Sequence, residues 1–182
     1  MSANLSRWVI DPSHTTVEFA VRHMMIATVK GRFAGVEGHI LADPSDLTTA
    51  QAEVTIDVAS IDTREPQRDE HLRSPDFFDA ANFPKITFKS REIRRKGENE
   101  YEMTGDLTIR GVTRPVTLSL TSEGQAKDPW GNERAAFTVS GKINRKDFGL
   151  NWNVVLETGG ILVGEEVRIS VEVEAIKQAA AA

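Results

Sequence analysis

The sequence predicts an all-β fold in which about eight antiparallel strands close into one barrel, with a short helix near one end. Apolar and polar side chains alternate along most of the chain, with the period of two residues that is typical of strands buried on one face. Short stretches rich in Gly, Pro, Asn and Asp separate these segments, so neighbouring strands are expected to run antiparallel. A sheet of this size closes or splits into two layers, because an open twisted sheet leaves exposed edges.

Each expected strand is identified by the apolar residues that share one face. In the first, at residues 16–22, Val17, Phe19 and Val21 alternate with polar side chains. The later strands show the same alternation and are expected, in order, at residues 31–43, 52–58, 86–88, 101–109, 116–121, 137–143 and 167–174.

The glycine residues favour a barrel over a two-layered sandwich. Several lie in or beside strands, where glycine marks a bend, a bulge or the close approach of another group. An eight-stranded barrel either fills with side chains or encloses one slender ligand, and glycine on the inner face leaves room for the ligand. The glycines concerned are Gly31, Gly35, Gly38, Gly105, Gly141 and Gly149.

One charged segment lacks the alternation and predicts a helix at about residues 65–74. Thr63 is a candidate cap, Glu65 lies in the first turn, and Pro75 ends the helix by restricting the residue before it. Because the segment has few apolar residues, we expect it to cover one end of the barrel as a lid. The side chains expected to turn inward from this region are those of Leu72, Phe77 and Phe78.

Length and composition indicate a single domain. The chain has 182 residues, of which 40% are hydrophobic, and this is enough for one core. We expect an extension at residues 1–7, a barrel domain at 8–176 and a tail at 177–182. The net charge of −5 argues against nucleic acid as a partner, because no excess of cations is available for phosphate groups. Cysteine is absent, which removes disulfides, thiol catalysis and cysteine-bound metal clusters.

The first residues, MSANLSRWVIDPSHTT, lack the apolar core of a signal peptide. No apolar run in the sequence approaches the length of a membrane span. These two observations predict a cytoplasmic protein without a transmembrane segment.

No cofactor motif is found, so no cofactor is expected. The stretch GGILVG at residues 159–164 precedes an expected strand, whereas a dinucleotide site requires a helix there. The histidines form no close metal-ligand motif, and no metal site is predicted. His14 lies in a turn and is expected to be structural. His23 and His71 have apolar neighbours and are better functional candidates.

Two charged segments have a structural interpretation. The acidic residues near Asp69 and Asp76 are flanked by cations, which indicates a surface helix with weak ion pairs rather than a pair of catalytic carboxylates. Residues 144–147 combine an amide, two cations and a carboxylate. There, a buried ion pair between Arg145 and Asp147 that holds a turn is favoured over contact with a ligand head group.

Five motifs give the chain a specific resemblance to a known family, and together they cover nearly its whole length. They are WVIDPSHTTVEFAVRH at residues 8–23, GRFAGVEG at 31–38, IDTREPQRDEHLRSPDFFDAANFPKITFKS at 61–90, GDLTIRGVTRPVTL at 105–118 and INRKDFGLNWN at 143–153. The sequence resembles the YceI-like, or polyisoprenoid-binding, family. The resemblance implies an extended lipocalin-like barrel of eight antiparallel strands with a short helix. It also implies a long apolar tunnel for an isoprenoid tail and no catalytic centre.

The resemblance directs attention to two sets of residues. The tunnel is expected to be lined by Val17, Phe19, Val21, Phe33, Ile40, Val54, Ile56, Phe77, Phe78, Phe88, Leu107, Ile109, Leu118, Val139, Ile143, Phe148 and Trp152. A polar head group is expected at the tunnel mouth, near Arg22, His23, Arg110, Asn144, Arg145 and Asp147.

We therefore expect a non-enzymatic protein that binds, stores or transports a long-chain apolar lipid. The lipid is an isoprenoid quinone or a polyprenyl phosphate or pyrophosphate. Burial gives a driving force, since removing apolar area from water is worth about 25 cal/mol per Å². The alternative is an enzyme that acts on a small hydrophobic substrate through His14 or His23 with a carboxylate partner, and it requires such a pair inside a pocket. A homodimer formed through outer strand faces is compatible with the resemblance, and a filled barrel with an exposed apolar patch would instead indicate an interaction module.

Overall fold

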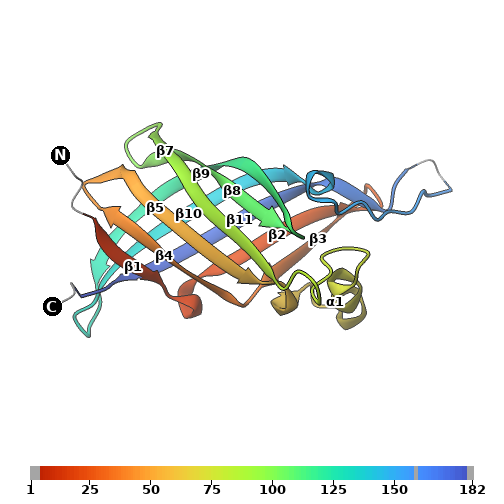
Figure 1. The fold of residues 1–182 in the computed structure, drawn as a ribbon, viewed down its shortest axis with the longest axis horizontal. Coiled ribbons are helices and arrows are strands. Elements are labelled where there is room, and N and C mark those ends of the chain that lie inside the picture. Colours follow the sequence, from red (N-terminus) through yellow and green to blue (C-terminus); the bar gives the residue numbers. More distant parts are fainter. Residues whose placement is uncertain (1–4, 158–159, 180–182) are drawn as a thin grey trace.

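The computed structural model, which describes residues 5–157 and 160–179, forms a closed antiparallel β-barrel of eight strands (Figure 1). Two of the eight strands are interrupted. β1 (Ser6–Ile10) and β2 (Thr16–His23) both pair with β11 (Val163–Lys177), so they act as one strand broken by the short η1 helix (Pro12–His14). β3 (Ala27–Phe33) and β4 (Val36–Asp43) pair with β2 and β1 respectively and form the second broken strand.

The remaining strands follow one another round the barrel as antiparallel neighbours. The order is β4, β5, β7, β8, β9, β10 and β11, and the pairing of β11 with β1 closes the sheet. These strands are β5 (Asp46–Asp57), β7 (Lys85–Arg95), β8 (Glu100–Ile109), β9 (Val112–Lys127) and β10 (Glu133–Asn144). The predicted barrel and its antiparallel order are confirmed, although most strands are longer than the alternation indicates.

The connection from β5 to β7 contains the helix and lies at one end of the barrel (Figure 1). It consists of η2 (Val58–Ser60), the two-residue strand β6 (Ile61–Asp62) and α1 (Pro66–Arg73). β6 pairs with the end of β3, which ties the connection to the barrel wall. The predicted helix at about residues 65–74 is therefore confirmed.

The hydrogen bonds of α1 differ from those expected. Glu65, not Thr63, caps the helix, because its carboxylate accepts a hydrogen bond from the backbone N–H of Gln67 at 3.3 Å. Thr63 is buried and donates from both its backbone N–H and its hydroxyl to Asp69, which is itself only 7% exposed. The expected surface patch of weak ion pairs is wrong at this position, since Asp69 fastens the start of the helix to the chain that leaves β6. Arg68 reinforces the link by donating to the hydroxyl and carbonyl oxygens of Thr63.

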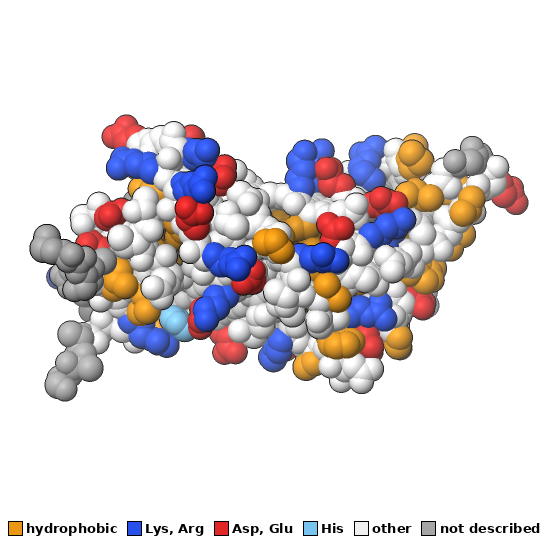
Figure 2. Space-filling model, turned by 45° about the horizontal axis from the view of Figure 1, so that its top comes forward, with side chains coloured by type: hydrophobic (Ala, Val, Ile, Leu, Met, Phe, Trp, Pro, Cys, Tyr) orange, Lys and Arg blue, Asp and Glu red, His pale blue; other side chains and the backbone are white. Residues whose placement is uncertain are grey.

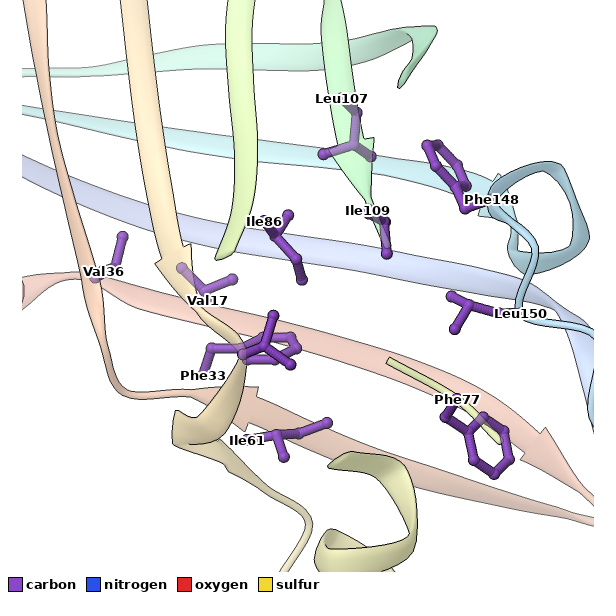
Figure 3. Packing of buried hydrophobic residues seen from close by; sticks show 11 residues of the cluster. Val17, Phe33, Val36, Ile61, Phe77, Ile86, Leu107, Ile109, Phe148 and Leu150 are labelled. Atoms are coloured by element: carbon purple, nitrogen blue, oxygen red, sulfur yellow. The ribbon is translucent and has the colours of Figure 1, made fainter. Parts of the chain in front are cut away.

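The two ends of the barrel are packed differently. The chain termini lie at one end of the barrel (Figure 1). At that end, a hydrophobic cluster around the buried Trp8 packs in the interior. At the end covered by α1, side chains from several strands and from the chain after η3 (Arg145–Phe148) converge on one interior space (Figure 3). The first cluster consists of Trp8, Ala42, Leu47, Ala135 and Ala175.

An ion-pair network fastens the break between β1 and β2 to the neighbouring wall. The guanidinium of Arg134 on β10 donates to Asp11 and Glu174 at 2.9 Å each and to Asp128 at 2.8 Å. The ligand-type atoms of Asp11, His14 and Glu174 lie within 4.8 Å of one another, but Arg134 already supplies a cation to two of these groups. The positions of these groups are therefore accounted for by ion pairs that join the break between β1 and β2 to β10.

This network predicts a pH-dependent contribution to stability. The hydrogen bond from Arg134 lowers the pKa of Asp128 from 3.8 to about 2. A carboxylate with a depressed pKa in the folded state stabilises the fold above its unfolded pKa and loses that effect as the pH falls towards its folded pKa. Arg134→Met should therefore lower the midpoint of urea unfolding at neutral pH. The difference from the wild type should narrow between about pH 4 and pH 2, and a difference that stays constant over this range would contradict the assignment.

Candidate functional site

An elongated cavity of about 350 Å³ lies inside the barrel. All eight barrel strands contribute side chains to its lining, which is almost entirely aliphatic and aromatic. Along β11 the lining extends from Val163 to Val173, which corresponds to roughly 30 Å of strand. The volume lies within the usual range of small-molecule sites, about 300–1,000 Å³. Its distribution along the strands suits a slender ligand.

The cavity exists because large inner side chains lie against glycines on the neighbouring strand. Phe19 on β2 pairs with Gly31 on β3, and a Cβ atom at Gly31 would overlap the ring of Phe19. Phe88 lies over Gly105 in the same way. These rings therefore lean along the wall and do not cross the axis of the barrel. The expectation that inner-face glycines leave room in the barrel describes these two positions correctly.

Most of the predicted tunnel residues line this cavity, and two do not. Ile40 packs instead against the cluster around Trp8 at the filled end. Phe148 is only 1% exposed and packs within the hydrophobic core, outside the lining. Every other residue of the predicted set faces the cavity. Whether these side chains contact a ligand remains a prediction.

Sequence reasoning missed part of the lining although the signal was present. Val167, Ile169, Val171 and Val173 alternate with polar residues on β11, and all four face the cavity. Ile86 shares a face with Phe88 and belongs to the lining for the same reason. Residues outside regular strands, such as Leu150 and Leu162, carry no such alternation and are found only from the structure.

The predicted head-group residues separate into two groups. Arg22, His23 and Arg145 line the cavity. The other three lie outside the lining and have different roles. The guanidinium of Arg110 donates to the carbonyl oxygens of Phe77 and Gly149, and the side chain of Asn144 caps η3. Asp147 is exposed at the surface, where its carbonyl oxygen accepts a hydrogen bond from Arg114.

Arg145 is a buried cation at the edge of an apolar space. It is 3% exposed, and its guanidinium donates to the carbonyl oxygens of Leu150, Val163 and Gly164. Among the described residues, no carboxylate lies within ion-pair distance of it, so the expected pair with Asp147 is wrong. Burial lowers the pKa of Arg145, yet an arginine remains charged at neutral pH. Its three hydrogen bonds hold the chain after η3 in place, and its side chain belongs to the cavity lining.

α1 and the segment after η3 form a lid over the cavity at the same end of the barrel. His71 of α1 stacks edge-on against Trp152, with ring centres 4.7 Å apart, and against Phe77, at 5.1 Å. His71, Leu72, Phe77 and Trp152 all belong to the cavity lining. Aromatic contacts therefore join the two segments of the lid.

The histidines test the enzymatic alternative directly. His14 bonds to Asp11 at 2.8 Å but lies outside the lining, with 58% of its side chain exposed. His23 lines the cavity, and none of the described carboxylates is bonded to it. His71 bonds to Asp76 at 2.9 Å, with 39% and 53% of the two side chains exposed, so this pair lies at the rim of the cavity. An enzyme that acts through His14 or His23 requires a histidine bonded to a carboxylate inside the cavity, and neither of these two histidines has that arrangement among the described residues.

Comparisons with known proteins agree with this architecture. A family model described as "YceI-like domain" matches residues 8–175. A UPF0312 protein of Staphylococcus epidermidis is 39% identical over 171 residues, which are 93% of this chain and 97% of that protein. A UPF0312 protein of Staphylococcus aureus is 36% identical over the same shares of the two chains.

Solved structures share the fold. The crystal structure of Burkholderia cenocepacia BcnA has a TM-score of 0.80 and 27% identity, over 91% of this chain and 98% of that one. The Campylobacter jejuni YCEI protein has a TM-score of 0.74 and 32% identity, over 87% and 90%. A polyisoprenoid binding domain from Saccharophagus degradans has a TM-score of 0.73 over 96% and 100%, but with 16% identity it shows likeness of fold alone. Separately, none of the helices in the described part of this chain has the length and apolar character needed to cross a bilayer.

The glycine that accommodates Phe19 gives a test of how the cavity is made. Gly31→Ala should push the ring towards the barrel axis, because the new Cβ meets ring atoms and the methyl group of Thr63. We expect a cost of about 1–3 kcal/mol in the free energy of unfolding, together with weaker binding of an apolar fluorescent probe. The matched double variant Gly31→Ala with Phe19→Leu should recover probe binding. Equal probe binding by the single variant and the wild type would contradict this explanation of the cavity.

Proposed function

The chain belongs to the YceI-like family, and from this premise we propose that it is a non-enzymatic carrier of a long-chain isoprenoid lipid. One observation carries the proposal: a slender apolar cavity runs along the inside of a closed barrel, with a filled end and an end covered by a small lid. A tail that enters such a space exchanges contact with water for contact with aliphatic walls. Binding then requires no catalytic group.

The charged residues of the lining favour a ligand with a polar head. Arg22, His23 and Arg145 belong to a lining that is mostly apolar and that also includes Glu18, Arg68 and His71. Arg145 has no carboxylate partner among the residues described, so its positive charge is available to a quinone oxygen or a phosphate group. We propose that the isoprenoid tail lies along the β11 wall and that the head is held near Arg145. Isoprenoid quinones and polyprenyl phosphates or pyrophosphates are therefore the first classes to test.

Recovery of bound lipid is the direct test of this function. The purified protein, analysed by native mass spectrometry and by organic extraction, should carry one apolar molecule per chain. Protein freed of lipid should bind an isoprenoid quinone, and the affinity should rise with tail length until the cavity is full. If no lipid is recovered and the affinity does not change with tail length, the proposal is wrong.

A variant with a blocked cavity provides the control. Val171 faces the cavity from the middle of β11, and the neighbouring Glu172 is exposed on the outside. Val171→Trp should reduce quinone binding at least about tenfold, because the added ring occupies apolar space that the tail requires. Glu172→Gln should bind as the wild type does. Thermal unfolding of both variants identifies any loss of binding that is caused by misfolding.

An enzyme is the second candidate, and the pair of His71 with Asp76 at the rim is the observation that favours it. A general base requires a reacting group within hydrogen-bond reach. The edge-on stacking of His71 on Trp152 accounts for its position as part of the lid. The same extraction experiment separates the two functions. A carrier returns the added lipid with its mass unchanged, whereas an enzyme returns a product that is absent when His71→Gln replaces the wild type.

A further inference from the structure

The loops beside the lid form an exposed apolar surface that the cavity itself does not explain. Hydrophobic side chains gather at the end of the molecule where the segment before β11 protrudes (Figure 2). We call this surface the apolar tip. It consists of Met24, Met25, Ile26, Val154 and Val155, which are 43%, 61%, 80%, 44% and 80% exposed.

The apolar tip is continuous with the cavity. Leu162 lines the cavity, and its backbone lies between the two loops of the tip. Its N–H donates to the carbonyl oxygen of Val154 at 3.0 Å, and its carbonyl oxygen accepts from the N–H of Met24 at 2.8 Å. His23, which precedes the first loop, also lines the cavity. The apolar tip therefore lies directly beside the lining of the proposed lipid site and is hydrogen-bonded to it.

The turn between β2 and β3 has a strained backbone, because its residues are not those that this type of turn prefers. Met24 and Met25 have φ angles of 52° and 63°, and the N–H of Ile26 donates to the carbonyl oxygen of His23 at 3.2 Å. A turn with two consecutive left-handed residues is normally made by Asn-Gly or Gly-Gly, because other side chains are strained there. Here two large apolar residues occupy both positions and face the solvent. Strain combined with apolar exposure points to a function for these side chains.

The composition of the two loops indicates what they contact. Residues 23–29 contain no Asp, Glu, Lys or Arg, and residues 150–164 contain one charged residue, Glu157, in a chain that is 27% charged. A phosphate-binding surface would require several cations. These segments contain none, and the adjoining Arg22 donates to the carbonyl oxygen of Met25 at 3.0 Å, which is one cation beside five apolar side chains. Side chains of this kind suit the boundary between the head groups and acyl chains of a bilayer, where apolar groups of peripheral proteins are buried about 5–10 Å deep.

A second copy of the chain suits the apolar tip less well than a bilayer does. A specific protein interface usually uses about 20–30 residues from each side, whereas the apolar tip presents five large side chains on two narrow loops. We therefore propose that the apolar tip inserts into the surface of a lipid bilayer and that lipid passes between the bilayer and the cavity beside it. The passage of lipid rests on the proposed function; the insertion is tested separately.

One double variant removes two of the five side chains of the apolar tip and at the same time gives the turn a sequence that suits its shape. Met24→Asn with Met25→Gly installs the residues that this turn prefers, so its melting temperature should equal or exceed that of the wild type. In flotation with phosphatidylcholine vesicles, the wild type should bind, and raising the salt concentration should not release it. The double variant should bind at least about tenfold more weakly, because it loses two exposed methionine side chains that the proposal places in the bilayer. Trp130→Ser is the matched control, since Trp130 is 80% exposed in the turn between β9 and β10, at the opposite end of the barrel.

The outcomes separate the two proposals. A wild type that does not float, or a double variant that floats equally well, overturns the insertion. A wild-type dimer in light scattering that the double variant converts to a monomer also overturns it, because the tip is then a protein interface. Quinone offered in detergent should bind equally to both proteins, and failure of both to bind it counts against the proposed function alone. Quinone offered in vesicles should enter the wild type about tenfold faster than the double variant, and equal rates overturn the passage through the tip.

Discussion

The structure depends on a close fit between aromatic rings and glycines on the inner wall of the barrel. A closed sheet of eight strands has just enough room for its own side chains, so an open axis requires that some of them lean aside. Phe19 over Gly31 and Phe88 over Gly105 do so on two pairs of neighbouring strands. The space that they leave is continuous with the cavity along β11, while the cluster around Trp8 fills the opposite end.

Two arginines form hydrogen-bond networks at the ends of the barrel, where the regular sheet is interrupted. Arg134 fastens the break between β1 and β2 with three carboxylates. Arg145 fastens the chain after η3 with three carbonyl oxygens. Because their partners differ, the positive charges of the two arginines are balanced to different extents. The charge of Arg134 is balanced by bonded carboxylates, whereas the bonded partners of Arg145 are neutral carbonyl oxygens and the nearby Glu165 acts on it through an electrostatic interaction.

Alternation in the sequence predicts the fold and most of the wall, because the inner and outer faces of a strand follow from parity alone. Val17, Val54 and Leu107 are found in this way. Parity does not tell at which level of the barrel a residue lies, and for this reason Ile40 belongs to the filled end. Parity also fails outside the strands. The carbonyl partners of Arg145, the contact of His71 with Trp152 and the strained turn at Met24 depend on where distant loops meet, and no local pattern encodes that.

We propose that the barrel holds an isoprenoid chain along its axis, with the polar end of that chain beside Arg145. A crystal structure of the protein with an isoprenoid quinone tests this most directly. We predict continuous ligand density along β11, from the level of Val173 to a head group near Arg145. Ligand density confined to the outer surface, with the axis occupied by rearranged side chains, would contradict the claim.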